Sequence, residues 1–163
     1  MDGLELEVTA VPVEGLELNG ALGLLDGEYT SWTAPLNTCA AQGLTTVAQY
    51  LELPIKQAPE WSYRVGANYS FDMGQRGVVS LGADYSAKDD HYNNVCASPG
   101  IRVQDYEFLN AQLRWENTDG RVSVTLADSE VFNGGFDFGR SLGFASGYLY
   151  PPRTWSLSVR YGL

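Results

Sequence analysis

Long apolar runs are missing from this sequence. The longest, residues 21–25, is far shorter than the roughly 18 residues that a membrane-spanning helix needs. Basic residues are scarce as well, since 10 Lys and Arg stand against 20 Asp and Glu, which gives a formal net charge of −10. Because binding to nucleic-acid phosphates requires clustered Lys and Arg, we expect no nucleic-acid partner.

Residues that carry catalytic chemistry are also few. His91 is the single histidine, no glycine-rich loop precedes a helical pattern, and the carboxylates are scattered, so we expect neither an enzyme nor a cofactor. The cluster of Asp89, Asp90 and His91 has side chains that could bind a metal ion. A polar strand end beside a loop explains the same residues, and we prefer this interpretation and expect no metal site.

Cysteine is limited to Cys39 and Cys96, which both fall in turn-rich stretches. Neither has the C-x-x-C neighbour that a zinc site would use. Two interpretations stay open, namely a disulfide that joins the first two long loops in an oxidising compartment, or two free thiols.

Strict alternation of apolar and polar residues is what the sequence has in abundance, and it predicts strands with one apolar and one polar face. It predicts strands at residues 4–10, 16–24 with an extension to 29 or 32, 61–71, 79–85, 106–115, 122–126 and 154–163. Tyr106 and Phe108 are at even-numbered positions, whereas the apolar residues Leu109 and Trp115 of the same strand are at odd-numbered ones. This difference in parity indicates a bulge or inward-facing aromatic residues. A short helix is expected near residues 45–51.

Short turns and long loops join these strands alternately. The short turns lie near residues 11–15, 73–77 and 117–120, and the long loops include residues 33–58 and 133–150. In a meander, this order puts all turns at one end of the sheet and all long loops at the other, as in outer-membrane barrels. We therefore predict an all-β, antiparallel up-and-down meander of about seven long strands that forms part of a transmembrane β-barrel.

Aromatic residues at the ends of the apolar rows indicate which face meets lipid. Eight to ten strand residues, tilted by roughly 40°, span about 20 to 25 Å, which matches the apolar band between the aromatic girdles of such barrels. The predicted girdle residues are Trp61, Tyr69, Phe71, Trp155 and Tyr161. The alternative, in which the apolar rows point inward as in a soluble lipocalin-like carrier, stays open.

Three segments carry a resemblance to a known family. They are Ala58-Pro59-Glu60-Trp61, residues 106–114 (YEFLNAQLR) and residues 152–161 (PRTWSLSVRY). Together they resemble the C-terminal barrel of TonB-dependent outer-membrane receptors, over nearly the whole chain, and the Pro-Arg-Thr-Trp run is the most specific piece. The chain ends in Leu163, where that family usually ends in Phe or Trp.

The resemblance implies an energy-coupled importer of iron chelates, cobalamin or oligosaccharides in the bacterial outer membrane. Its barrel would have about 22 strands and a plug, and residues 1–163 would be its C-terminal part, without the plug and the N-terminal strands. We expect such a fragment not to transport alone. The implied partners are outer-membrane lipid, the remainder of the barrel and plug, TonB through that plug, the barrel-assembly machinery and a small-molecule ligand such as a ferric siderophore.

The implied signature for the barrel-assembly machinery is Val159, Tyr161 and Leu163. Ligand contacts would come from the long loops, where the candidates are Trp32, Tyr50, Tyr92 and Tyr148, although girdle or loop-packing roles explain each of these residues too. Two other classes remain, which are the lipocalin-like carrier and a small self-contained structural or adhesive outer-membrane barrel. An eighth strand within the first long loop could complete the latter.

Overall fold

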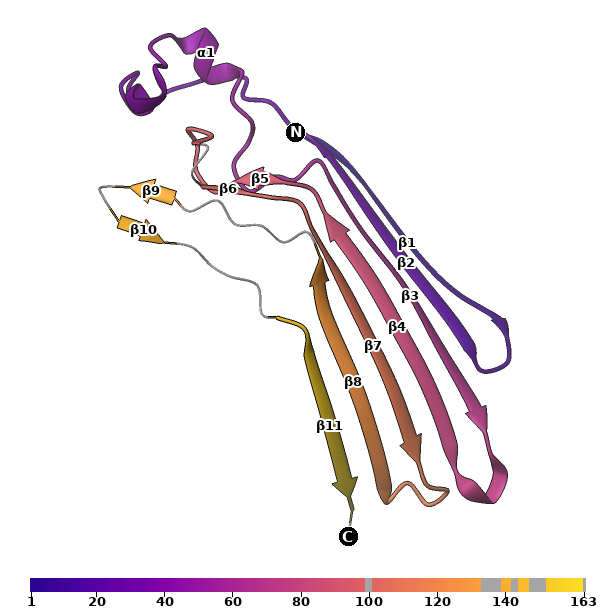
Figure 1. Cartoon of the computed structure of the whole chain (residues 1–163). Helices are drawn as coiled ribbons and strands as arrows, with labels where there is room; N and C mark the ends of the chain where they lie inside the picture. Colours follow the sequence, from indigo (N-terminus) through magenta and orange to yellow (C-terminus); the bar gives the residue numbers. More distant parts are fainter. Residues whose placement is uncertain (99–100, 133–138, 142–143, 147–151, 163) are drawn as a thin grey trace.

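The computed structural model describes residues 1–98, 101–132, 139–141, 144–146 and 152–162 (Figure 1). Seven long strands form one antiparallel sheet in the order β1-β2-β3-β4-β7-β8-β11. Their bounds are β1 Asp2–Val13, β2 Leu16–Asp26, β3 Trp61–Asp72, β4 Val78–Lys88, β7 Tyr106–Glu116, β8 Val122–Phe132 and β11 Thr154–Tyr161. The predicted all-β meander is thereby confirmed. Within the described residues the sheet is not closed, and β1 and β11 are its two edges.

The second strand is shorter than the sequence pattern predicts. It ends at Asp26 and does not continue to Tyr29 or Trp32. Its pairing with β3 stops at Leu24 and Trp61, and Pro59, just before β3, has no N–H to continue the ladder. Without a hydrogen-bonded partner, the alternating residues beyond Asp26 do not form a strand.

The sequence pattern is irregular near Pro12 and at Tyr106 and Phe108, and the structure has a register shift only at the first of these places. The first strand extends to Val13, beyond the predicted break, and its register with β2 shifts between Ala10 and Val13, around Pro12. A proline is tolerated there because it sits on an edge strand and at a bulge. In contrast, the register of β7 with β4 runs without a shift, so Tyr106 and Phe108 are aromatic residues on the polar side of the sheet.

The long loops and the short turns lie at opposite ends of the sheet (Figure 1). The first loop, residues 27–60, contains η1 (Ala40–Gln42) and α1 (Val47–Leu51), and the helix begins with a capping box between Thr46 and Gln49. The small hairpins β5 (His91–Tyr92) with β6 (Arg102–Val103) and β9 (Gly139–Ser141) with β10 (Phe144–Ser146) were not predicted. Strands of two or three residues are too short to show a period.

The turn between β3 and β4, which contains η2 (Gly74–Arg76), depends on a glycine. Gly77 has a φ of 93°, and a Cβ there would lie 2.0 Å from the Glu116 carbonyl oxygen. We expect Gly77→Ala to lower the free energy of unfolding by about 1 to 3 kcal/mol. Gly74→Ala is the matched control, because Gly74 also has positive φ but no atom lies within 4 Å of its added Cβ. Equal urea midpoints for the two variants in detergent micelles would contradict the steric explanation.

Candidate functional site

The apolar residues of all seven strands form one continuous face. Antiparallel partners directly opposite each other point to the same side of a sheet, and here apolar residues are paired with apolar residues. One row crosses six strands and consists of Leu16, Tyr69, Leu81, Leu113, Leu126 and Leu157. The alternation that is visible within each strand is therefore kept in register across the sheet.

No described element covers this apolar face. Val65 is 51% exposed, Leu81 47% and Leu157 69%. The buried apolar residues among those described are only Cys39, Tyr50, Ala87 and Val103, and two of them lie in the first long loop and its small helix. A chain of this length is long enough to bury a core, but in the described residues the large apolar side chains of the strands are mostly exposed.

Aromatic side chains lie near both ends of the apolar face. Trp61 and Trp155 are at the loop ends of β3 and β11, whereas Tyr69, Phe71 and Tyr161 are toward the turns, as the girdle prediction places them along the strands. Three further aromatic residues of this face, Tyr63, Tyr85 and Trp115, belong to the predicted apolar rows but were not included in the girdle prediction. Tyr63 stacks on Trp61, with ring centroids 5.6 Å apart, and the Trp115 indole donates to the Arg76 carbonyl at 2.8 Å. Their shared parity with the predicted girdle residues was the available signal.

A charged cluster marks the loop end of the apolar face on β8 and β11. Arg153 donates two hydrogen bonds to Asp128, at 2.9 and 3.0 Å, and lies 3.5 Å from a Glu130 oxygen. Its guanidinium also sits 4.7 Å from the Trp155 ring centroid, a cation–π geometry. The Pro-Arg-Thr-Trp run thus neutralises one carboxylate and positions one aromatic ring where β11 begins.

The opposite face of the sheet is polar and internally hydrogen-bonded. One row crosses six strands and consists of Asn19, Gly66, Asp84, Asn110, Ser129 and Thr154. Asn110 donates to Asp84 at 3.0 Å, Ser129 donates to Asn110 at 2.6 Å, and Arg64 lies 3.4 Å from the second oxygen of Asp84. These contacts join β3, β4, β7 and β8 through side chains alone. We call the six residues of this row, from Asn19 to Thr154, the polar row.

A hollow of about 400 Å³ lies over the polar row and the next row toward the turns. Glycines help to form it, because a Cβ on Gly66 would lie 2.7 Å from the Asn19 amide oxygen, and one on Gly82 would lie 3.1 Å from the Gln112 amide nitrogen. Asn68, Gln112, Thr154 and Ser156 are among its other lining residues. Amide and hydroxyl side chains therefore line the hollow together with small alanine and glycine residues and a few charged ones.

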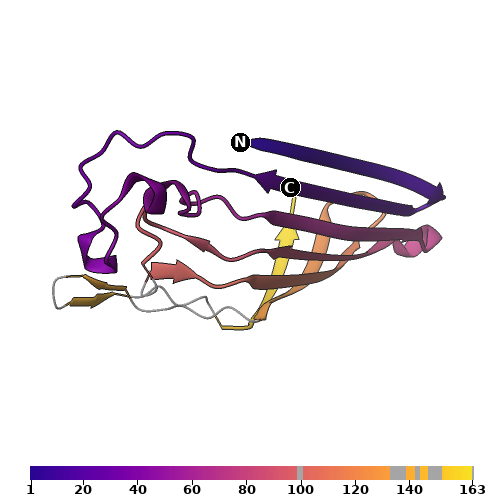
Figure 2. The same ribbon diagram turned by 90° about the horizontal axis from the view of Figure 1, so that it is seen from above.

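The polar face is the more sheltered of the two in the central strands. Asn68 and Ser70 in β3 are half-buried, whereas Val65 and Tyr69 on the apolar side of the same strand are exposed. The strands follow a curve rather than one plane (Figure 2). A curved sheet shelters its concave side, so the polar face is the inner side of the curve and the apolar face is the outer side.

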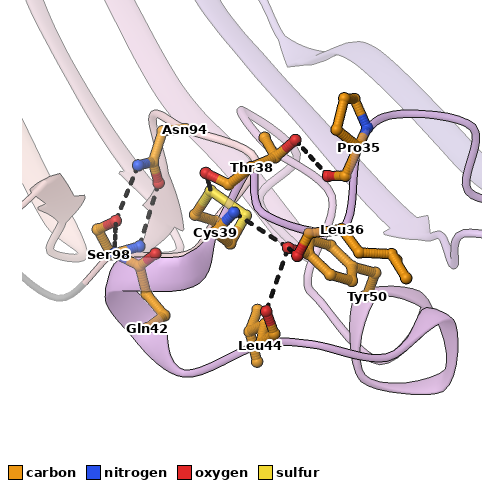
Figure 3. Close-up of a disulfide and its surroundings, with 10 residues drawn as sticks. Pro35, Leu36, Thr38, Cys39, Gln42, Leu44, Tyr50, Asn94 and Ser98 are labelled. Carbon is orange, nitrogen blue, oxygen red and sulfur yellow. Dashed lines mark hydrogen bonds between the residues drawn. A yellow bond between two sulfur atoms is a disulfide. The ribbon is translucent and has the colours of Figure 1, made fainter.

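Cys39 and Cys96 form a disulfide, the first of the two interpretations that the sequence leaves open, with 5.4 Å between their Cα atoms. It joins loop 27–60 to loop 89–105 (Figure 3), and we call these two loops the loop cap. The side-chain amide of Gln42 also donates to the Ser98 hydroxyl at 2.9 Å across the two loops, and the backbone N–H of Gln57 donates to the Tyr92 carbonyl at 2.8 Å. The loop cap is therefore one connected structure.

Tyr50 lies at the centre of the loop cap, and its burial agrees with the loop-packing role that the sequence left open beside ligand contact. Its side chain is 0% exposed, its hydroxyl donates to the Leu36 carbonyl at 2.6 Å, and it accepts from the Cys39 amide at 3.0 Å (Figure 3). Trp32 stacks on Tyr50, with ring centroids 4.4 Å apart. Loop packing thus accounts for Tyr50 and for one face of Trp32. Tyr92 lies in β5, half-buried, and Tyr148 lies outside the described residues.

The cluster of Asp89, Asp90 and His91 lies where β4 passes into the β5–β6 hairpin. Arg102 donates a 2.6 Å hydrogen bond to Asp90 and holds the pKa of that carboxyl below its usual value. The same hydrogen bond raises the pKa of Arg102. Among the described residues, no three His, Cys, Asp or Glu side chains are grouped as a metal ion would require. The hydrogen bond between Asp90 and Arg102 therefore joins the two sides of the β5–β6 hairpin.

The structure describes two of the three residues of the predicted barrel-assembly signature. Val159 and Tyr161 lie on the apolar face of β11, directly opposite Val124 and Val122 of β8. Leu163 lies outside the described residues. Among the helices that the structure describes, none is long and apolar enough to cross a membrane.

Comparison with known proteins gave no match, whether against family models, curated sequences or solved structures.

Proposed function

We propose that the chain is the C-terminal barrel part of a TonB-dependent receptor in the bacterial outer membrane, which takes up a scarce nutrient such as an iron–siderophore complex. In this proposal the apolar face meets outer-membrane lipid, the polar face lines the lumen, and the remaining strands and the plug belong to the same receptor. TonB would act only through that plug. The barrel-assembly machinery would recognise the end of β11 through Val159, Tyr161 and Leu163.

The observation that carries the proposal is the uncovered apolar face that continues across seven strands. The five long strands β2, β3, β4, β7 and β8 have 11 or 12 residues each, which suits a tilted strand across a bilayer. Aromatic residues near both ends of the face and a polar, sheltered inner side are the further features of such barrels. A lipocalin-like carrier would instead need these apolar rows inside a closed core.

Strand direction argues for further strands. Because the antiparallel sheet has seven strands, β1 and β11 both run toward the turn end. Direct closure between them would make a parallel pair, whereas bacterial single-chain outer-membrane barrels are antiparallel with an even number of strands. The self-contained alternative would need its eighth strand in loop 27–60, and that loop contains only η1 and α1 as regular elements.

Refolding of the 163-residue chain from urea tests the proposal. We expect sheet structure in detergent micelles and aggregation in plain buffer, because the apolar face has no cover in water. The chain should also lack the heat-resistant band that a closed barrel gives on unheated gels, since its edges are unpaired. A folded monomer in plain buffer would overturn the lipid-facing assignment. A heat-resistant, protease-protected monomer in outer membranes would instead favour the self-contained barrel.

A further inference from the structure

We infer that the loop end of the polar face binds a small, metal-free aromatic carboxylate, at a site where Arg64 and Lys88 lie beside the rings of Tyr106 and Phe108. The inference rests on the proposed function, because it names a class of solute that the inner wall would bind. The site is a second hollow, of about 330 Å³, on the loop side of the polar row. Ligand pockets have volumes of roughly 300 to 1,000 Å³, so this hollow suits a ligand with one ring rather than a chelate with several arms.

Strand register forms this site from two neighbouring rows that cross four strands. The row next to the polar row consists of Ala21, Arg64, Ser86 and Phe108, and the one beyond it consists of Gly23, Ser62, Lys88 and Tyr106. Because residues directly opposite each other share a face, all of these residues belong to the polar side of the sheet. From β2 to β7 the two rows therefore pass from small residues, through cations and hydroxyls, to aromatic rings.

The charge of the hollow is positive. Among the described residues that line it, the charged ones are Arg64 and Lys88. The ion pairs within the described part of the chain do not include Lys88, and Arg64 contacts Asp84 through Nη2 at 3.4 Å while its side chain stays 60% exposed. A guanidinium has five N–H donors, so Arg64 can also donate to a ligand carboxylate. Charges farther away than about 10 Å are largely screened at exposed sites in 0.1 M salt, so the net charge of −10, which is spread over the whole chain, does not prevent the binding of an anion here.

Two aromatic rings border the hollow on its β7 side. The ring centroids of Tyr106 and Phe108 are 5.3 Å apart, in an edge-to-face arrangement. Aromatic rings attract one another in this geometry and in offset stacks, so the ring of a ligand can extend the pair. On the β2 side, a Cβ on Gly23 would lie 3.1 Å from the Ser62 hydroxyl oxygen, so the glycine leaves room beside that donor. A molecule with a ring and a carboxylate therefore meets aromatic groups on one side and cations and a hydroxyl on the other.

Calorimetric titration of the full chain, refolded in zwitterionic detergent micelles, tests the inference, with protein-free micelles as the blank. The probe is 4-hydroxybenzoate, and 4-hydroxybenzamide is its neutral counterpart with the same ring. We expect saturable binding of the carboxylate that weakens as the ionic strength rises, because the two cations are partly exposed to solvent. The amide should bind about fivefold more weakly or less, since hydrogen bonds to a charged group are stronger than those to a neutral one.

Two variants each remove one part of the site. Lys88→Gln removes a positive charge and keeps a polar side chain, whereas Phe108→Leu removes a ring and keeps an apolar side chain. Each should weaken the binding of 4-hydroxybenzoate about three- to tenfold, as expected for one charged contact or one ring contact. Arg121→Gln is the matched control, because it makes the same change of charge in the turn between β7 and β8, at the opposite end of the sheet, and the affinity should not change.

Equal binding of the acid and the amide, tighter binding of ferric citrate, or binding that neither variant weakens would each overturn the inference, as would the absence of saturable binding. These outcomes are separate from micelle-dependent folding, which tests the proposed function. A chain that folds in micelles without binding 4-hydroxybenzoate would therefore overturn only the inference. Lys88 and Phe108 lie on different strands, so a folding defect in one variant leaves the other to decide.

Discussion

Leu126→Arg is expected to abolish stable insertion of the chain into micelles and lipid vesicles. Leu126 lies near the middle of β8 on the apolar face, between Leu113 and Leu157 in the row that crosses six strands. An arginine on the lipid face near the bilayer midplane costs about 2 to 4 kcal/mol. That is a large part of the stability of a typical domain. Urea titration in lipid vesicles, followed by circular dichroism, measures the loss.

Ser158→Arg is the control for this substitution. Ser158 lies on the neighbouring strand, opposite Thr125 on the polar face, so the same charge there would meet the wet side of the sheet. We expect it to change the midpoint little. If the apolar face were exposed to water, Leu126→Arg would be as well tolerated as Ser158→Arg, and that result would contradict the membrane-facing assignment.

The double substitution Cys39→Ser with Cys96→Ser is expected to loosen the loop cap by up to about 4 kcal/mol, which is the chain-entropy estimate for the 57-residue separation of the two cysteines. The cross-link holds two loops that are also joined by the hydrogen bonds of Gln42 with Ser98 and of Gln57 with Tyr92. Tyr50 would lose the fixed position of its Cys39 partner. Limited proteolysis should then cut within residues 27–60 and 89–105 and leave the sheet strands protected.

Mass spectrometry supplies the complementary measurement. Native chain should resist alkylation until it is reduced, and reduction should add the mass of two hydrogens. Two alkylatable thiols in unreduced native protein would show that the loops are held by other contacts. Ser98→Ala, which removes only the hydrogen bond from Gln42, is the matched control and should leave the proteolytic pattern nearly unchanged.

Alternation was sufficient to predict the sheet because side chains alternate sides at every second residue, whatever the rest of the fold does. The predicted strand at residues 61–71 agrees with β3 to within one residue. The end of β2 was not predictable in this way, since it depends on where β3 starts to offer hydrogen bonds. The bulge at Pro12 likewise depends on the edge position of β1, which a single strand pattern does not contain.

Site residues were predictable where parity alone places them. Trp61, Tyr69, Phe71, Trp155 and Tyr161 could be assigned to one face from spacing. Tyr50 could not be assigned to one role, because a buried loop tyrosine and an exposed one look alike in sequence, and only its contacts with Leu36 and Cys39 distinguish them. The Arg153 contact with Asp128 joins residues 25 positions apart, and it too depends on strand pairing.

The sequence by itself determined that this protein is a meander of two-faced strands with turns at one end and loops at the other, because period and turn residues are local properties. Only the tertiary structure decided that the apolar rows align into one outer face, which no described element covers, and that Asp84, Asn110 and Ser129 meet in a polar row on the inner side. Strand register and sheet curvature bring these residues together, and both depend on pairing between segments far apart in the chain.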